Sequence, residues 1–358
     1  MIGVAEPPLP HGGGSITTDR GLRSRERKGA EVLGAFSMER GFQRGSALLA
    51  VLWVSAALAA IAFSLSTTVR SEIDRTSTSV DSLRSYYLAA GGIHRATYEV
   101  LWSAQNPGKR VLPRYTTSID YTFPSGVAHV EIIPEAAKLD VNRVLPEELY
   151  RLLVALGQEP ERAREIALAI VDWRSPAAAG SGLDQYYLAL TPSFRARHAS
   201  LEEIEELLSV KGITPDIFYG TYVPSDAPEG RQLIARQGLI DCLSVFGSND
   251  RIDANTASPA VLAAIGVPPD VISALVQRRQ VAPLTEVQLG PFLGGAGGGR
   301  LRVEGNSILT IRATARLALQ NGQFSDARRT VSALVKYMPT GYDAPVHILR
   351  WYDNAWSN

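Results

Sequence analysis

The side chains of this chain that are most able to do chemistry are carboxylates, five histidines and a single cysteine. Paired carboxylates can act as general acid and base, and they occur at Glu202-Glu203 and Glu205-Glu206. Both pairs fall on a predicted helix, where such pairs most simply form a solvated face. The histidines have no metal-ligand spacing, and Cys242 by itself can form neither an internal disulfide nor a thiolate metal site. The chain has no G-x-S-x-G, HExxH or P-loop motif, so we expect no enzymatic activity.

The composition limits the classes of partner. The chain has 358 residues, and its 36 basic residues balance 36 acidic ones, which argues against a general polyanion binder. Roughly two or three domains are expected at this length. The first 37 residues contain few large apolar side chains and mixed charges, which predicts disorder, and Met38 is an alternative start of translation.

An uncharged apolar segment follows this N-terminal stretch. No charged residue occurs between Gly45 and Val69. A helix over residues 46–69 would be roughly 36 Å long, which is enough to cross a hydrocarbon core of about 30 Å. The segment is too long for a secretory signal, and no A-x-A site lies just before Arg70. Because basic residues precede the segment, the positive-inside rule predicts a cytoplasmic N-terminus and export of the rest.

The boundary at Gly45-Ser46 resembles the class III leader of type IV pilins and type II secretion pseudopilins. In those families a membrane peptidase cuts after the glycine, and the helix becomes first an anchor and later the core of a filament. The resemblance places the cleavage at Gly45–Ser46, with Gly41–Phe42 as the competing site. The fifth mature residue is then Ala50, or Ser46 for the competing cut, where most pilins have Glu. A subunit without this carboxylate cannot neutralise the α-ammonium of a neighbour, so it can sit at the end of a filament.

Helical spacing continues beyond the apolar segment to about Trp102, with Gly91-Gly92 as a predicted interruption. Residues 118–123 and 127–133 alternate in polarity around a Pro-Ser-Gly turn, which predicts a β-hairpin. In a pilin these two strands would lie against the helix.

A second hairpin is predicted much later in the chain. Residues 307–319 and 327–338 have strand patterns and are separated by Asn-Gly, a strong hairpin signal. Residues between the hairpins have a helical pattern, so the sheet is predicted to be split by a helical insertion. The glycine-rich residues 294–299 are predicted to be a flexible return linker, and the C-terminal tail to cover a sheet edge.

We therefore predict an α+β fold of pilin type. It has a long N-terminal helix and a small antiparallel sheet, with a large all-helical domain inserted between the strands. The predicted parts are a cleaved cytoplasmic leader (1–45), a transmembrane and stalk helix (46–102), the sheet (103–134 and 300–340), the insertion (135–290) and a tail (341–358).

The insertion contains a sequence repeat with the pattern [IL]-D-x-N-x3-P-x2-L. The two copies begin at Leu139 and Ile252. In each copy the asparagine, Asn142 or Asn255, is predicted to cap the turn into the helix that follows.

Two turns of the insertion resemble the helix-hairpin-helix motif. Gly212 and Gly266 each follow an apolar helix end and precede a Pro-Asp pair. This turn often binds DNA phosphate through backbone N–H groups. The second glycine of the DNA-binding form is missing in both, and acidic residues crowd the first, so a purely structural hairpin is predicted.

These features combine in one family resemblance. The leader without an acidic fifth residue, the split sheet, Val171-Asp172-Trp173 and the stretch IDANTASPAVL resemble the minor pseudopilin K family of type II secretion, over residues 38–338. The resemblance implies a single-pass inner-membrane protein with a periplasmic C-terminal domain. It implies a tip subunit that joins minor pseudopilins I, J and H, is cut by the prepilin peptidase, and primes and caps the pseudopilus on the inner-membrane platform.

Some members of that family bind calcium in the insertion. Of the acidic loop that would hold the ion, only Asp172 and Asp184 remain here, and Arg174 is present. Calcium requires six to eight oxygens, so the resemblance leaves calcium possible but weakly supported. Asp184 is the best remaining ligand candidate, with a capping or turn role as the alternative.

Two other functions stay open. The D-x-N-x3-P pattern also occurs in membrane-anchored helix-hairpin-helix DNA-binding proteins of the competence type, and a type IV pilus minor pilin could have a similar build. The strands that flank the insertion and the missing second glycines favour the secretion family, so we expect no nucleic-acid binding.

Overall fold

The structure is a computed structural model that describes residues 46–176, 182–224, 233–248, 250–303, 307–319, 322–339 and 341–355. The chain divides into two compact units, Met1–Val69 and Arg70–Asn358. The predicted leader, including Met38, Gly41 and Gly45, lies outside the described residues.

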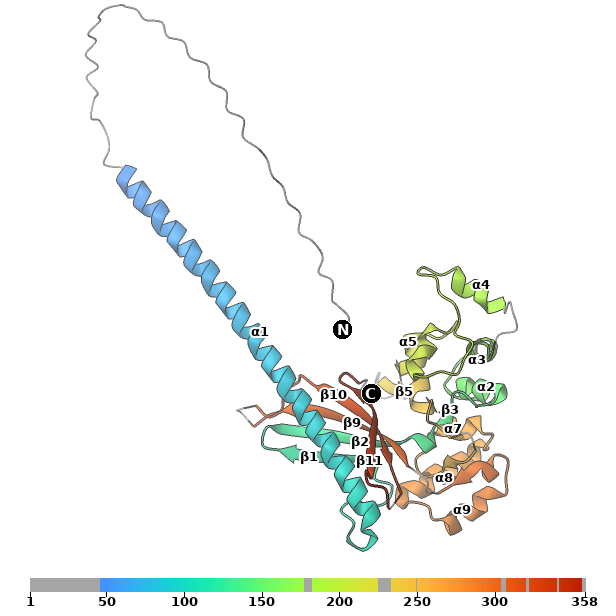
Figure 1. Cartoon of the computed structure of the whole chain (residues 1–358). Helices are drawn as coiled ribbons and strands as arrows, with labels where there is room; N and C mark the ends of the chain where they lie inside the picture. The colour runs from blue at the N-terminus through green and yellow to red at the C-terminus, as the bar shows by residue number, and fades with distance from the viewer. Residues whose placement is uncertain are drawn as a thin grey trace, which may run out of the picture. The chain divides into compact units, whose positions relative to one another are not determined.

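The longest element is helix α1, Ser46–Gln105 (Figure 1). In the first unit its large apolar side chains are exposed all round, from Leu48 at 72% to Val69 at 47%. An 18-residue window of this helix reaches a mean hydropathy of 2.4, and among the described residues it is the one helix apolar and long enough to cross a membrane. A helix that is apolar on every side requires apolar surroundings.

In the second unit, α1 continues through Gly91-Gly92, so the predicted interruption is wrong. A Cβ atom at Gly92 would lie 3.0 Å from the Cβ of Ala128 and 3.1 Å from the Cγ2 of Val130. The glycine lets the helix backbone approach the sheet, and this packing outweighs a helix-propensity cost of about 1 kcal/mol.

Five antiparallel strands form the sheet on which α1 packs (Figure 1). Both predicted hairpins are confirmed, since β1 pairs with β2 and β9 pairs with β10. The tail adds a fifth strand at the edge beside β10. The order is β1 (Ser118–Phe123), β2 (Gly126–Pro134), β9 (Ile308–Leu317), β10 (Arg329–Tyr337) and β11 (Val346–Tyr352).

Alternation along the strands creates one buried face. Ala128, Val130 and Ile132 of β2 belong to a hydrophobic cluster that also contains Ala89 and Ile93 of α1. Because side chains alternate between the faces of a strand, every second residue of β2 reaches this cluster.

The insertion lies between β2 and β9, two strands that are direct neighbours in the sheet. The α+β fold with a helical insertion between strands is therefore confirmed. Its helices are α2 (Pro146–Ala155), α3 (Pro160–Arg174), α4 (Gly182–Leu188), α5 (Pro215–Tyr219), α6 (Leu239–Cys242), α7 (Pro259–Ala264), α8 (Pro269–Val281) and α9 (Glu286–Leu293). Short 3-10 helices occur at Pro107–Lys109, before β1, and at Glu135–Ala137, Ile204–Ser209 and Gly298–Arg300.

Short strand pairs accompany these helices. β3 (Leu139–Asp140) pairs in parallel with β6 (Leu243–Ser244), and β7 (Ile252–Asp253) pairs in parallel with β8 (Leu301–Arg302). An antiparallel hairpin joins β4 (Thr221–Pro224) and β5 (Leu233–Arg236).

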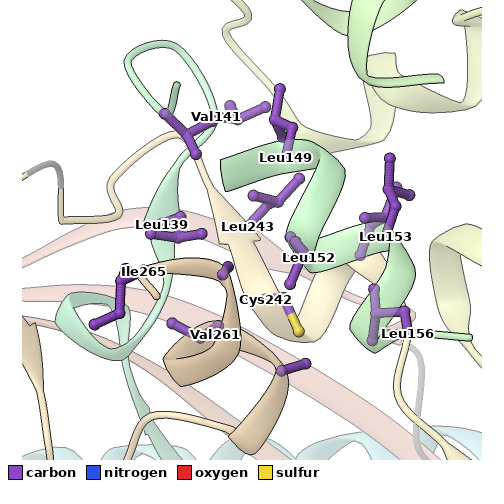
Figure 2. Packing of buried hydrophobic residues seen from close by; sticks show 14 of the residues in the cluster. Leu139, Val141, Leu149, Leu152, Leu153, Leu156, Cys242, Leu243, Val261 and Ile265 are labelled. Carbon is purple, nitrogen blue, oxygen red and sulfur yellow. The ribbon is translucent and has the colours of Figure 1, made fainter. Parts of the chain in front are cut away.

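The insertion has a hydrophobic core of its own, separate from the cluster beneath α1. Figure 2 shows Leu149, Leu152 and Leu153 of α2 around the same space as Val261 and Ile265 of the α7 segment. Cys242 lies in this core, and its burial raises the pKa of the thiol to about 12.

The glycine-rich stretch 294–299, predicted to be a flexible linker, is packed at Gly297 and Gly298 and exposed at 294–296 and 299. Gly297 adopts φ +70°, and a Cβ atom there would lie 2.7 Å from the carbonyl oxygen of Ile265. Gly298 is buried, and its N–H donates to the Gly295 carbonyl at 3.0 Å. The glycines are needed because two backbone segments touch here.

Candidate functional site

The repeated aspartate closes the same turn in both copies of the pattern. Asp140 Oδ1 accepts the backbone N–H of Asn142 at 2.9 Å, and Asp253 Oδ1 accepts that of Asn255 at 3.1 Å. Such Asx turns fix the backbone locally. Burial raises the pKa of Asp140 from its usual value, against the opposing effect of this hydrogen bond.

The repeated asparagine joins segments that are far apart in the chain. Asn142 Nδ2 donates to the Leu201 carbonyl at 3.0 Å, and its Oδ1 accepts the Leu201 N–H at 2.8 Å. Asn255 makes the same two bonds to Leu284, at 3.1 and 2.7 Å. Each side-chain amide thus pairs with one backbone residue in the manner of a β-ladder.

The predicted capping role of these asparagines is therefore wrong. Helix α2 begins only at Pro146 and α7 only at Pro259, so each asparagine is too early in the chain to be the N-cap. The cap of α7 is Ser258, whose Oγ accepts the N–H of Val261 at 3.3 Å.

An arginine completes each copy. Arg174 at the end of α3 donates to the carbonyls of Val141 and Val144. Arg279 in α8 donates to the carbonyls of Ala254 at 3.0 Å and Ala257 at 2.7 Å.

Burial lowers the pKa of both guanidinium groups, Arg174 and Arg279, and the neighbouring Asp140 and Asp253 partly oppose this. The repeat pattern does not find these arginines, because their spacing from the aspartate differs between the copies.

The insertion is thus built from two copies of one structural unit. In each, a helix pair follows the Asx turn, with Gly157 at φ +79° between α2 and α3 and Gly266 at φ +90° between α7 and α8. Gln158 N–H bonds to Leu153 O at 2.9 Å, and the equivalent bond of Val267 to Leu262 is 3.1 Å.

The helix-hairpin-helix turn predicted at Gly266 is confirmed, with Gly157 as its structural counterpart. Gly212, which the sequence had paired with Gly266, leads from a 3-10 turn into α5 instead. The Pro-Asp pairs start α5 and α8 as predicted. Pro268, which has no N–H to donate, is the N-cap of α8.

Of the four glutamates in residues 202–206, only Glu202 is exposed, so they form less of a solvated face than the sequence predicted. Glu206 Oε1 accepts the N–H groups of Glu202 and Glu203 at 2.7 and 3.1 Å and pairs with Arg197 at 2.9 Å. Burial raises the pKa of Glu206, but these hydrogen bonds outweigh it and hold the pKa below its usual value. Burial raises the pKa of Glu205. The cluster fixes a turn, and nothing in it is arranged as an acid–base pair.

The two candidate calcium ligands are linked by a histidine that the sequence did not single out. His198 Nε2 lies 2.8 Å from Asp184 Oδ1, and its Nδ1 lies 3.1 Å from the carbonyl oxygen of Asp172. The hydrogen bond with Asp184 raises the pKa of His198, which favours the imidazolium with two N–H donors.

The described residues offer few ligands for calcium, and residues 177–181, between the two candidate ligands, lie outside the described chain. The described part of the chain brings together no three His, Cys, Asp or Glu side chains that could hold a metal ion. The carboxylate of Asp184 already faces the ring of His198, with Oδ1 2.8 Å from Nε2.

The residues of the predicted leader site are only partly within the described chain. Gly45 lies outside it, and Ser46 is the first residue of α1. Ala50 is exposed on the apolar part of α1. The cleavage site and the effect of the missing carboxylate remain predictions.

Comparisons with known proteins agree with this architecture. Residues 135–220 match the family model of the type II secretion system protein K, described as its first domain. The chain is 28% identical over 215 residues to the type II secretion system protein K of Pectobacterium carotovorum, covering 52% of this chain and 65% of that protein. It is 25% identical over 196 residues to that of Klebsiella pneumoniae, covering 49% of this chain and 60% of that protein. These matches span less than two thirds of the length of the relatives.

A solved structure has the same fold. The crystal structure of the GspK-GspI-GspJ complex from enterotoxigenic Escherichia coli contains a chain that aligns with a TM-score of 0.52 at 16% identity. The alignment covers 79% of this chain and all of that one. With a long α1 and a sheet split by two repeated helical units, the chain is similar to the protein K family of type II secretion systems.

Proposed function

We propose that this protein is a minor pseudopilin at the tip of the type II secretion pseudopilus. There it initiates and caps filament assembly for protein export across the outer membrane. It acts as a structural subunit, without catalysis.

The division of α1 into two halves carries this proposal. The first half exposes apolar side chains on every side, whereas the second half buries one face, including Ile93 and Ala96, against the sheet. The first half is suited to lipid and later to the apolar core of a filament. The second half holds the folded part, which we place in the periplasm with the N-terminus in the cytoplasm.

The place at the tip rests on two features. Ala50 offers no carboxylate to the α-ammonium of a neighbouring subunit, so this subunit can occupy the end of a filament. The insertion also adds a second hydrophobic core to the pilin-like sheet. The additional folded volume suits a subunit that caps a filament.

The proposed partners are minor pseudopilins I and J, with H, the prepilin peptidase and the inner-membrane platform. The structural relative was solved as a complex named for K, I and J. Co-expression of the full chain with I and J, followed by purification through a tag on J, should yield all three proteins in equal amounts. Recovery of I and J without this chain would contradict the proposal.

Processing tests the leader. After co-expression with a prepilin peptidase, N-terminal sequencing should find Ser46 as the first residue. Gly45→Val should block the cut, whereas Ala50→Glu should still be processed. Normal processing of the valine variant, or Phe42 as the first residue, would overturn the proposed site.

Duplex DNA distinguishes the competence-type alternative. Salt-sensitive binding of duplex DNA by the full chain would favour that alternative, because phosphate contacts release counterions. The tip subunit should show no such binding in an electrophoretic mobility assay at low salt.

A further inference from the structure

A pocket of about 360 Å³ lies where α1 ends and β1 is about to begin. Its floor is apolar, since Leu112, Ile132 and Leu309 line it and each is only 5% exposed. Arg110 and Arg114 also line it. We refer to this site as the arginine pocket.

The rim of the arginine pocket is held in place by the last turns of α1. The buried Ser103 accepts the N–H of Leu112 with its Oγ at 3.1 Å, and its carbonyl accepts Arg110 Nε at 3.3 Å. Thr116 Oγ1 closes the rim by donating to the Pro113 carbonyl at 2.9 Å. These bonds give the pocket its shape before any ligand arrives, which reduces the ordering cost of binding.

Backbone strain marks the same rim. Tyr115 has φ +61°, in the left-handed region that a non-glycine residue rarely adopts. This conformation is strained for a residue with a side chain, and such strain concentrates at binding sites.

The segment that contributes the rim of the arginine pocket carries charges of one sign in its sequence. Residues 106–117 include Lys109, Arg110 and Arg114 and no acidic residue. An apolar floor beneath two arginines suits a ligand whose apolar side chain lies next to a carboxylate, because the guanidinium fork matches carboxylate geometry.

The edge of the sheet next to the pocket is open in the part of the chain that the structure describes, where β1 is the outermost strand. The N–H of Ile132 donates to Thr117 O at 2.8 Å, and bonding residues alternate along an antiparallel pair. The N–H and C=O groups of Ser118, Asp120 and Thr122 therefore point away from β2. Such an edge can pair with an extended peptide.

We propose that the arginine pocket and the edge of β1 together bind the extended carboxyl-terminal segment of a partner polypeptide. Its last, apolar side chain enters the pocket, and its terminal carboxylate meets Arg110 and Arg114. The preceding residues form a strand against Ser118, Asp120 and Thr122. A fatty acid would match the pocket but could not use the edge. This site is independent of the tip function proposed above.

A labelled ten-residue peptide of alternating threonine and valine that ends in leucine tests the carboxylate contact. Its binding to the full chain in a zwitterionic detergent is followed by fluorescence polarisation. We expect the peptide with a free carboxylate to bind at least about tenfold more tightly than the same peptide with a terminal amide, as charged hydrogen bonds are lost. Equal binding of the two, no binding of either, or displacement by decanoate as complete as by unlabelled peptide would overturn the proposal.

Substitutions place the peptide on the protein. The double variant Arg110→Gln with Arg114→Gln should weaken binding of the free-carboxylate peptide about tenfold. Arg162→Gln, at an exposed arginine of α3, is the matched control and should leave binding unchanged. An equal effect of both changes, or no effect of the double variant, would contradict the site. The amidated peptide tests the same contact even if the double variant fails to fold.

N-methylation of the peptide tests the strand. Methyl groups on alternate backbone nitrogens block pairing only when those N–H groups face β1. One of the two methylated registers should therefore lose binding and the other should keep it. Loss in both registers or in neither would overturn pairing with the β1 edge.

Discussion

At the residue scale, the aspartate and asparagine that recur in the two repeats, and the arginine that binds each turn, have separate roles within one unit. The aspartate closes a local turn, the asparagine joins a distant backbone segment, and an arginine from a later helix binds the turn carbonyls. The asparagine is the residue with the longest reach, since Asn142 pairs with Leu201 and Asn255 with Leu284. The stability of each unit should depend on it.

Asn142→Ala should lower the free energy of unfolding by about 1–3 kcal/mol, because the N–H and C=O of Leu201 lose their partners. Thermal unfolding of the full chain in detergent, followed by circular dichroism, measures the loss. The control is Asn106→Ala, whose amide makes a local bond to Trp102 at the end of α1. An equal loss in both variants would contradict the joining role.

The hydrogen bonds of Glu206 predict a pH dependence. Backbone N–H groups and Arg197 hold its pKa in the folded state below the unfolded value, despite the opposing effect of burial. A lowered folded pKa means stability that is present above the unfolded pKa and is lost as pH falls. Glu206→Gln should therefore cost about 1–2 kcal/mol at pH 7 and much less near pH 3.5. A difference from wild type that does not shrink on acidification would contradict this.

At the element scale, the path of α1 over the sheet is decided by close packing. Gly91 and Gly92 are neighbours in sequence but have different surroundings. A Cβ at Gly91 would meet only the ring of Phe123 at 4.0 Å, whereas one at Gly92 would meet two β2 side chains near 3.0 Å. A side chain can therefore be accommodated at Gly91 but not at Gly92.

Gly91→Ala should stabilise the protein by about 0.5–1 kcal/mol through helix propensity. Gly92→Ala should destabilise it by roughly 1–3 kcal/mol, because α1 and β2 must move apart. The two variants serve as controls for each other in thermal unfolding. The same sign of change in both would show that the approach of α1 to the sheet does not constrain the helix.

At the scale of the whole molecule, a buried carboxylate and a rim ion pair connect the insertion to the sheet. Glu135 follows the end of β2 and is only 2% exposed. Its carboxylate accepts a hydrogen bond from the Thr310 hydroxyl at 2.6 Å and forms an ion pair with Lys138 at 3.4 Å. Glu203 of the insertion pairs with Arg350 of β11 at 2.8 Å, with both side chains partly exposed. Burial makes the first connection the more important one.

Glu135→Ala should therefore cost about 3 kcal/mol or more, since it leaves Lys138 buried without this partner. A double-mutant cycle between Glu203 and Arg350 should give a coupling of at most about 1 kcal/mol, which added salt weakens. Urea unfolding of the full chain in detergent measures both. A coupling energy between Glu203 and Arg350 that exceeds the loss caused by Glu135→Ala would contradict the greater importance of the buried carboxylate.

Elements whose signals are local can be predicted from the sequence. The apolar run before Arg70, the alternation on either side of Pro124 and the D-x-N repeat predicted α1, the first hairpin and the duplicated insertion. These signals suffice because hydrophobic period and turn chemistry act over a few residues.

Contacts between groups that are far apart in the chain can be read only from the tertiary structure. It placed His198 between Asp172 and Asp184, two candidate calcium ligands, and Arg174 and Arg279 on turn carbonyls. These contacts join positions whose separations follow no period. The physical reason is that buried polar groups must find partners, and the partner is whichever group the packing brings near.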